Sequence, residues 1–371
     1  MLPASDARSE RGASWLELFF DLVYVAAIAA LAHELHDEHS VVGLAVFGGL
    51  FVPVWWAWRS FTWYSSSFGT GGWGDRVGLL VAMLASAVLA AGLGGAAQGD
   101  STTFVVAYAG LLVVLCALHG AAWRREPTVR AINARQVVGN GLGAVLWLAS
   151  LAVDEDVRPV LWAMAMLVLI GTPLAVLAQP LRAYDSHHIA ERYGLFTLIV
   201  LGESVVVTVE GFEAGSGAEA VAVAVVGFVM AGAIWWVYFD RFRGMPGGGP
   251  AVLFVWAQVH GLVFAGIAAA AVGIEFCVEA AASGQALQIV DRLPLGAGLA
   301  AYLAAMAAIR STTRRADIVV GMRLGAGLVI LALAVGGDGL GPFGFVGMVG
   351  AVFVAEAAME MWRWPPVEQA S

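Results

Sequence analysis

The sequence contains no lysine, two cysteines and few charged residues of either sign. Charged residues make up 13% of its 371 residues, whereas soluble domains carry roughly 25%. This shortage excludes the two or three soluble domains that the length alone would suggest. The 19 basic residues are all arginines and the net charge is −9, but the charges are scattered over the expected loops. No basic patch indicates a nucleic-acid partner.

The chain also lacks the residue spacings that identify common enzyme and metal sites. Cys116 and Cys277 lie in or beside apolar runs, without a spacing suited to metal binding or to a disulfide. No phosphate-binding Gly-Lys-Ser loop, nucleophile elbow or His-Glu-x-x-His sequence is present. These absences disfavour an enzyme, and they disfavour ATP-driven transport by this chain alone. We expect no cofactor and no metal.

Long apolar runs are what the sequence does contain, and hydrophobic residues make up 60% of it. About 20 apolar residues in a helix cross the hydrocarbon core of a bilayer, and the alternation typical of a membrane β-barrel is absent. We therefore predict an all-α, polytopic integral membrane protein with 12 transmembrane helices. The expected spans are residues 15–35, 41–63, 77–97, 103–123, 134–153, 159–179, 190–210, 219–239, 251–273, 293–309, 317–336 and 343–361. The tenth is expected to be short.

The distribution of the arginines predicts the orientation of these helices. Loops on the side of the N-terminus hold most of them, whereas the opposite loops hold only Arg158 and Arg292. Because cytoplasmic loops are enriched in basic residues, both termini are predicted to be cytoplasmic. The polar segment 1–14 leads directly into a full-length apolar helix, so we expect no cleavable signal peptide.

The two halves of the chain resemble each other. Val137-Val138-Gly139 recurs as Val319-Val320-Gly321, and the same spacing relates Asp21 to Glu203. Six expected spans, an even number, separate the members of each pair, so we predict two parallel six-helix repeats. The expected divisions are a tail at 1–14, repeats at 15–183 and 184–365, and a second tail at 366–371.

Glycines in the repeated segments predict close helix packing. Gly139 and Gly143 in the first half correspond to Gly321 and Gly325 in the second. Small residues let the backbones of neighbouring helices approach in a membrane. We expect this at all four positions.

Two carboxylates interrupt the first expected span. Glu17 and Asp21 lie one helical turn apart and therefore on one face. An ionised side chain in the bilayer costs several kcal/mol, from about 2.5 upward, and faces a partner or water. Asp21 and its repeat-related counterpart Glu203 are predicted to bind a cation or exchange protons. The alternative is that each acid is hydrogen-bonded and fastens one helix to another.

Arg59 in the second expected span is a candidate partner that would tune Asp21 together with Glu17. The alternative is an arginine whose side chain reaches the interface through an aromatic belt. The corresponding segment of the second half carries Asp240 and Arg241. That repetition favours a charge clamp at a helix end.

A polar cluster opens the second half. His188, Glu191 and Arg192 are predicted to form a network between the repeats, with Glu191 and Arg192 tuning Glu203. His188 and Glu191, three residues apart, could hold a metal ion, but no third ligand stands at a motif spacing. A pH-sensitive network is the favoured interpretation.

Further polar residues lie inside later spans. His260 is predicted to be a better pore-lining candidate than His119, because His260 lies near the middle of its span and His119 near a helix end. The alternative is a buried core histidine. Arg323 is a candidate partner for Glu356, and Glu360 lies one turn further on.

Two motifs resemble a known family. The stretch from Trp15 to Val25, WLELFFDLVYV, is similar to the signature of the bacterial low temperature requirement A (LtrA) family, as are His188 to Phe196 and Leu201 to Ser204. The resemblance covers nearly the full chain. It implies a polytopic protein of the bacterial cytoplasmic (inner) membrane, with no agreed substrate or reaction. A shorter resemblance, Phe20-Asp21 before an Ala/Ile-rich run, is to the first-helix Phe-Ser-Asp motif of endolysosomal potassium/proton channels, and it favours ion movement over catalysis.

Three functions are compatible with these features. The leading hypothesis is a secondary transporter or channel for cations or small solutes that uses the repeat-related carboxylates, with membrane lipids and a cation or proton as partners. A lipid-handling or lipid-modifying membrane protein, with its polar cluster at the inner leaflet, is the alternative. A membrane sensor is disfavoured because no soluble domain is expected to pass on a signal. The sequence is also compatible with a homo-oligomer.

Overall fold

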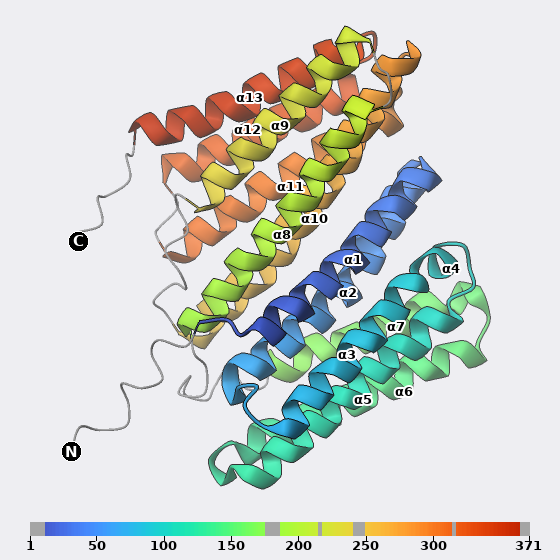
Figure 1. Cartoon of the computed structure of the whole chain (residues 1–371), viewed down its shortest axis with the longest axis vertical. Coiled ribbons are helices and arrows are strands. Elements are labelled where there is room, and N and C mark those ends of the chain that lie inside the picture. The colour runs from blue at the N-terminus through green and yellow to red at the C-terminus, as the bar shows by residue number, and fades with distance from the viewer. Residues whose placement is uncertain (1–11, 175–185, 214–216, 240–248, 314–316, 364–371) are drawn as a thin grey trace. The chain divides into compact units, whose positions relative to one another are not determined.

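The computed structural model describes residues 12–174, 186–213, 217–239, 249–313 and 317–363. Every regular element in these ranges is a helix (Figure 1). The α-helices are α1 (Trp15–Glu38), α2 (Val41–Phe68), α3 (Trp73–Ala91), α4 (Leu93–Ala97), α5 (Thr102–Arg125), α6 (Arg130–Ala149), α7 (Arg158–Leu174), α8 (Ser186–Glu213), α9 (Ala218–Phe239), α10 (Pro250–Ser283), α11 (Ile289–Thr313), α12 (Ile318–Gly336) and α13 (Pro342–Arg363). Short 3-10 helices are η2 (Pro127–Val129), η3 (Ser150–Ala152) and η4 (Glu155–Val157).

Ten helices in the described residues are long and apolar enough to cross a membrane. They are α1, α2, α3, α5, α7 with η4, α9, α10, α11, α12 and α13. The expected class, a helical membrane protein, is confirmed. The other two expected spans correspond to α6, which carries Asn133 and Arg135, and to α8, which carries Glu191, Arg192 and Glu203. Both are helical but more polar, and the count of 12 stays a prediction.

Several expected boundaries differ from the structure, and the span expected at 251–273 continues to Ser283 as α10. The span expected at 77–97 is divided at Gly92 into α3 and α4. A Cβ at Gly92 would lie 2.7 Å from the backbone nitrogen of Phe104, so the chain turns where it touches α5. The short span expected at 293–309 was wrong, because α11 has 25 residues and includes Asp291 and Arg292. Both side chains are buried and paired within the protein, so they do not end the helix.

The described residues belong to two compact units. The first comprises Met1–Glu34, Gly49–Arg192 and Gly249–Ala251, and the second comprises Leu35–Gly48, Tyr193–Gly248 and Val252–Ser371, in each case as far as the structure describes them. The units are defined by packing and are not a test of the expected repeat boundaries, which stay a prediction.

In the first unit, α5 packs against α3 and α6, and α6 packs against α7 (Figure 1). The rings of Tyr108, Trp147 and Trp162 form a cluster, with centroid distances of 4.6 Å and 5.1 Å from Trp147 to its two neighbours. Gly139 lies against the Thr172 side chain, where a Cβ would be 2.1 Å from Oγ1. Small residues at this crossing therefore bring α6 and α7 together, as the glycine pattern predicts.

In the second unit, α12 packs against α11 and α13, and α13 packs against α9. The backbones of α10 and α11 approach closely, since a Cβ at Gly273 would lie 2.2 Å from the backbone nitrogen of Leu295 and one at Gly298 would lie 2.6 Å from the carbonyl oxygen of Gly266. Gly321 and Gly325, in contrast, have nothing within 4 Å of an added Cβ. The expectation that these two glycines serve close packing is therefore wrong for the described residues.

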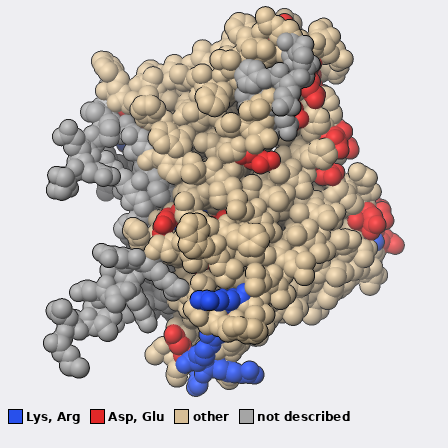
Figure 2. Space-filling model, viewed as in Figure 1, with Lys and Arg blue, Asp and Glu red and all other residues tan. Residues whose placement is uncertain are grey.

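Large apolar side chains cover the outside of the helices. Leu84, Leu167 and Leu328 are each more than 60% exposed, and Figure 2 shows a face on which charged side chains form only a few groups. Contiguous exposed apolar surface is rare on soluble monomers and marks contact with a membrane or a partner. The composition of this surface fits a lipid environment.

Candidate functional site

The start of α1 is held by a reciprocal cap. Ser14 and Glu17 stand three residues apart, and Glu17 Oε2 accepts hydrogen bonds from the Ser14 backbone N–H at 2.9 Å and from its hydroxyl at 2.8 Å. The Glu17 backbone N–H in turn donates to Ser14 Oγ at 3.4 Å. This is a Ser-x-x-Glu capping box, and it gives Glu17 a helix-capping role that our sequence analysis missed although the motif is readable.

The second oxygen of Glu17 faces α8. His188 Nε2 donates to Glu17 Oε1 at 3.1 Å. Glu17 is 2% exposed and His188 4%. One carboxylate therefore caps α1 and joins it to the beginning of α8.

Asp21, one turn further along α1, is fully enclosed by donors. The Arg192 guanidinium donates through Nη2 to Oδ1 and through Nε to Oδ2 at 3.4 Å, and Trp58 Nε1 of α2 donates to Oδ1 at 2.7 Å. Asp21 is 0% exposed and Arg192 is 1% exposed. A buried acid is thereby neutralised by a buried base.

Arg192 is itself satisfied on its remaining sides. It donates to Ser65 Oγ at 3.0 Å and to the Glu17 carbonyl oxygen at 3.4 Å. Its Cζ lies 5.9 Å from the ring centroid of Phe20 and 5.8 Å from that of Trp58, within the range of cation–π attraction. The side chain is thus held in one orientation.

These contacts form two layers related by one helical turn. Glu17 and Asp21 are four residues apart on α1, and His188 and Arg192 are four residues apart on α8. Residues at that spacing share a face, so each acid meets one base. We call Glu17, Asp21, His188 and Arg192 the acid–base cluster.

Glu191 and Arg192, which were expected to tune Glu203, have other partners in the structure. Glu191 accepts a hydrogen bond from the Ala13 backbone N–H at 3.2 Å, so it contacts the segment before α1. Arg192 was expected beside Glu203, but its described partner is Asp21.

Glu203 is only partly buried, in contrast to Asp21. It lies on α8 in the second unit, beside Ser204, which lines a small, mostly apolar pocket with residues of α9, α10 and α11. The two acids that the repeat relates therefore have different surroundings. Their equivalence stays a prediction.

Arg59 is 4% exposed in α2. Its guanidinium lies 4.6 Å from the ring centroid of Trp56 and 4.8 Å from that of Trp63. The side chain is therefore covered by aromatic rings within the protein. Its expected counterparts Asp240 and Arg241 lie outside the described residues.

His260 lies in an aromatic part of the second unit. Its Nδ1 donates to the Trp256 carbonyl oxygen at 2.8 Å, and ring centroids of Trp256, Tyr193 and Tyr238 lie 4.2, 5.1 and 5.9 Å away. These contacts favour the alternative interpretation of a buried core histidine over a pore-lining one.

A third buried ion pair lies in the second unit. Arg323 of α12 pairs with Glu360 of α13, with Nη2 2.9 Å from both carboxylate oxygens and Nε 3.1 Å from Oε2. The candidate pairing with Glu356 was therefore wrong. Glu356 is 1% exposed, and neither of its oxygens has a hydrogen-bond partner in the described structure. Sequence could not choose between the two acids because they lie one turn apart on one face.

Chemically, the acid–base cluster is a set of four ionisable side chains, each at most 4% exposed, arranged as two pairs. Each acid is paired with a base of a different kind, Glu17 with the imidazole of His188 and Asp21 with the guanidinium of Arg192.

Comparison with known proteins identifies relatives over most of the length. The model of the bacterial low temperature requirement A protein (LtrA) family matches residues 12–358. The chain is similar to "Uncharacterized protein RA0937" of Rhizobium meliloti (strain 1021), with 30% identity over 238 residues, which cover 61% of this chain and 58% of the relative. The matched region thus spans less than two thirds of that relative. No solved structure matches the chain.

Proposed function

This chain belongs to the bacterial low temperature requirement A (LtrA) family, and we propose that it is a secondary transporter or channel for cations or small solutes in the bacterial inner membrane. The acid–base cluster is the proton- or cation-responsive group. One observation carries this proposal: four ionisable side chains, each at most 4% exposed, are paired between α1 and α8. Ionisable residues within membrane spans mark ion pathways and proton relays by default.

The energetics favour function over stability as the reason for the cluster. Replacing a buried ion pair by well-packed apolar residues is often neutral or stabilising by about 1–4 kcal/mol. A protein that needed only a contact between α1 and α8 could make it with apolar side chains. The charges of Asp21 and Arg192 are therefore retained at a cost, as expected if they must respond to another charge.

The pairs also provide a means of response. A proton that reaches Asp21 removes its charge and loosens its bond to Arg192, whose guanidinium then remains with neutral acceptors. A proton on His188 strengthens the bond to Glu17 in the neighbouring layer. Proton uptake thus shifts the balance between the two layers and between the helices that carry them. Glu203 is proposed as the corresponding acid of the second half.

Purified protein in proteoliposomes tests this function. An internal pH dye reports proton flux under an imposed cation gradient, and the wild type should give flux that depends on the gradient. Asp21→Asn together with Glu203→Gln should lower it at least tenfold. Glu126→Gln, which removes an exposed carboxylate between α5 and η2, is the matched control and should retain flux. Normal flux in the double variant would remove both acids from the mechanism.

The alternative function, lipid handling, places the polar cluster at the inner headgroups. His188 and Arg192 are 4% and 1% exposed, so their side chains are enclosed by protein and paired with acids. This burial favours permeation over direct contact with headgroups. An altered lipid profile after deletion of the gene, together with absent flux in liposomes, would reverse the preference.

A further inference from the structure

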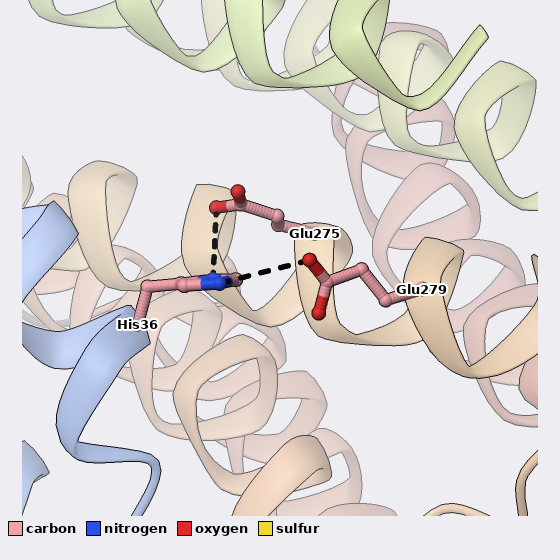
Figure 3. Close-up of side chains that lie close together, drawn as sticks. All are labelled: His36, Glu275 and Glu279. Carbon is pink, nitrogen blue, oxygen red and sulfur yellow. Dashed lines mark ion pairs between the residues drawn. The ribbon is translucent and has the colours of Figure 1, made fainter. Parts of the chain in front are cut away.

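A second group of ionisable side chains lies at the other end of α1, within the second unit. His36 stands in the last turn of α1, and Glu275 and Glu279 stand one turn apart on α10 (Figure 3). Figure 3 shows both carboxylates directed toward the imidazole ring. None of the three residues belongs to the acid–base cluster, and our sequence analysis did not identify the group.

The geometry brings one ligand atom from each residue into a small volume. His36 Nδ1 lies 3.4 Å from Glu275 Oε2, and His36 Nε2 lies 3.6 Å from Glu279 Oε1. Three ligand atoms, one from each side chain, lie within 4.8 Å of one another. Two ligands bound to one metal at about 2.1 Å are at most about 4.2 Å apart. The long glutamate side chains need only a small inward rotation to meet that limit.

The imidazole ring of His36 is held in place, but its contacts with the two glutamates are long. It stacks on Phe276, with ring centroids 5.2 Å apart and planes inclined by 26°. Nδ1 of His36 is buried, and its contact with Glu275 Oε2 at 3.4 Å is an ion pair without hydrogen-bond geometry. Burial of a polar atom with only a poorly aligned partner is unfavourable, and a bound metal ion would give this nitrogen a better one.

The neighbouring residues support the position of the ring. His39 lies next to the end of α1 in a left-handed conformation, with a φ of 40°, and its ring stacks on the same Phe276 at 4.2 Å. His39 Nε2 in turn pairs with Asp291 at the start of α11. The end of α1 is therefore anchored to α10 and α11 within this unit, and the three ligand side chains start from fixed backbones.

We propose that His36, Glu275 and Glu279 bind one divalent transition-metal ion. Imidazole suits Zn²⁺ and other first-row metals, and carboxylates suit Mn²⁺ and harder ions. One nitrogen and two oxygens therefore select a borderline divalent cation, with water completing the coordination shell. The two carboxylates and nearby Asp37 give the site a negative charge that attracts a cation.

The site is partly open, so an ion can reach it. The side chains of His36 and Glu275 are 23% and 29% exposed, and that of Glu279 is 57% exposed. If both termini are cytoplasmic, as the arginines predict, the end of α1 and the end of α10 face the outside. The ion would fasten these two helix ends together. This inference does not depend on the proposed function.

Metal binding to the purified full-length protein tests the site. After treatment with a chelator, the detergent-solubilised protein is titrated with Zn²⁺ and with Mn²⁺ by calorimetry, and its melting temperature is measured with and without each metal. We expect one ion per chain and a higher melting temperature with metal. Glu279→Gln and His36→Asn should each weaken binding at least tenfold. His33→Asn, an exposed histidine on the same helix, is the matched control and should bind as the wild type does.

A ligand-preserving variant separates loss of a ligand from loss of folding. Glu279→His keeps a metal-binding atom at this position and should retain the increase in melting temperature that Glu279→Gln loses. Co²⁺ absorption in the visible range, displaced by Zn²⁺, reports coordination directly in the wild type. Absence of stoichiometric binding by the wild type, or equal binding by the variant lacking all three ligands, would overturn the proposal. Loss of flux in liposomes with metal binding intact would overturn only the proposed function.

Discussion

Arg192 of α8 donates hydrogen bonds to both carboxylate oxygens of Asp21 of α1, and both residues are at most 1% exposed. Removal of one partner from a buried pair leaves an uncompensated charge, which costs about 3–5 kcal/mol. Arg192→Ala should therefore lower the melting temperature in detergent strongly. Asp21→Asn combined with Arg192→Gln, which keeps hydrogen-bonding groups toward Trp58 and Ser65, should recover most of the loss. Additive losses in the double variant would show that the two charges do not stabilise each other.

The capping box predicts different effects for its two residues. Ser14→Ala removes the hydroxyl that caps α1 and should reduce stability by about 0.5–2 kcal/mol, with little change in flux. Glu17→Gln keeps a capping side chain but removes the charge opposite His188, so it should change the pH dependence of flux more than stability. Melting temperature and flux measured on both variants distinguish these roles. Equal effects of the two changes on flux would contradict this division.

Two acids one turn apart on α13 should respond differently to the same substitution. Glu360→Gln leaves the buried Arg323 without its ion pair and should be destabilising by about 3–5 kcal/mol. Glu356→Gln removes a buried carboxylate that makes no hydrogen bond, so it should leave the melting temperature unchanged or raise it. Thermal unfolding of the two variants side by side is the measurement. Similar losses in both would show that Glu356 also takes part in the ion pair.

Acid should weaken the start of α12. Asp317 directly precedes the apolar span Ile318–Gly336 and caps this helix by accepting from the backbone N–H groups of Val319 and Val320. Hydrogen bonds from Arg310 hold the pKa of Asp317 below its usual value. A lowered folded-state pKa means that the stabilisation is present above the unfolded pKa of about 3.9 and disappears as the pH falls below it. Asp317→Asn, which retains a capping side chain, should lose less stability than the wild type between about pH 5 and pH 3. Melting temperatures across that range test this, and identical acid profiles would exclude Asp317 as a contributor.

Local patterns in the sequence predicted most of the helices and several members of the candidate site. Apolar runs placed α1 and α2 correctly, and the acids of α1 and the bases of α8 were each identified as unusual within apolar surroundings. The Ser-x-x-Glu cap and the four-residue spacing on each helix were also readable. The sequence could not predict which acid pairs with which base, because Arg192 contacts Asp21 only when the start of α8 packs beside α1. His36 and Glu275 are likewise brought together only by helix packing, because they lie far apart in the sequence and belong to no common motif.

Flux through the charge-free pair tests the central claim most directly. The double variant Asp21→Asn with Arg192→Gln keeps a hydrogen-bonded contact between α1 and α8 but removes both buried charges. Reconstituted at the same density as the wild type and verified to be folded, it should show cation-dependent proton flux reduced at least tenfold. Flux equal to that of the wild type in this folded variant would show that the buried charges of the acid–base cluster are not needed for permeation.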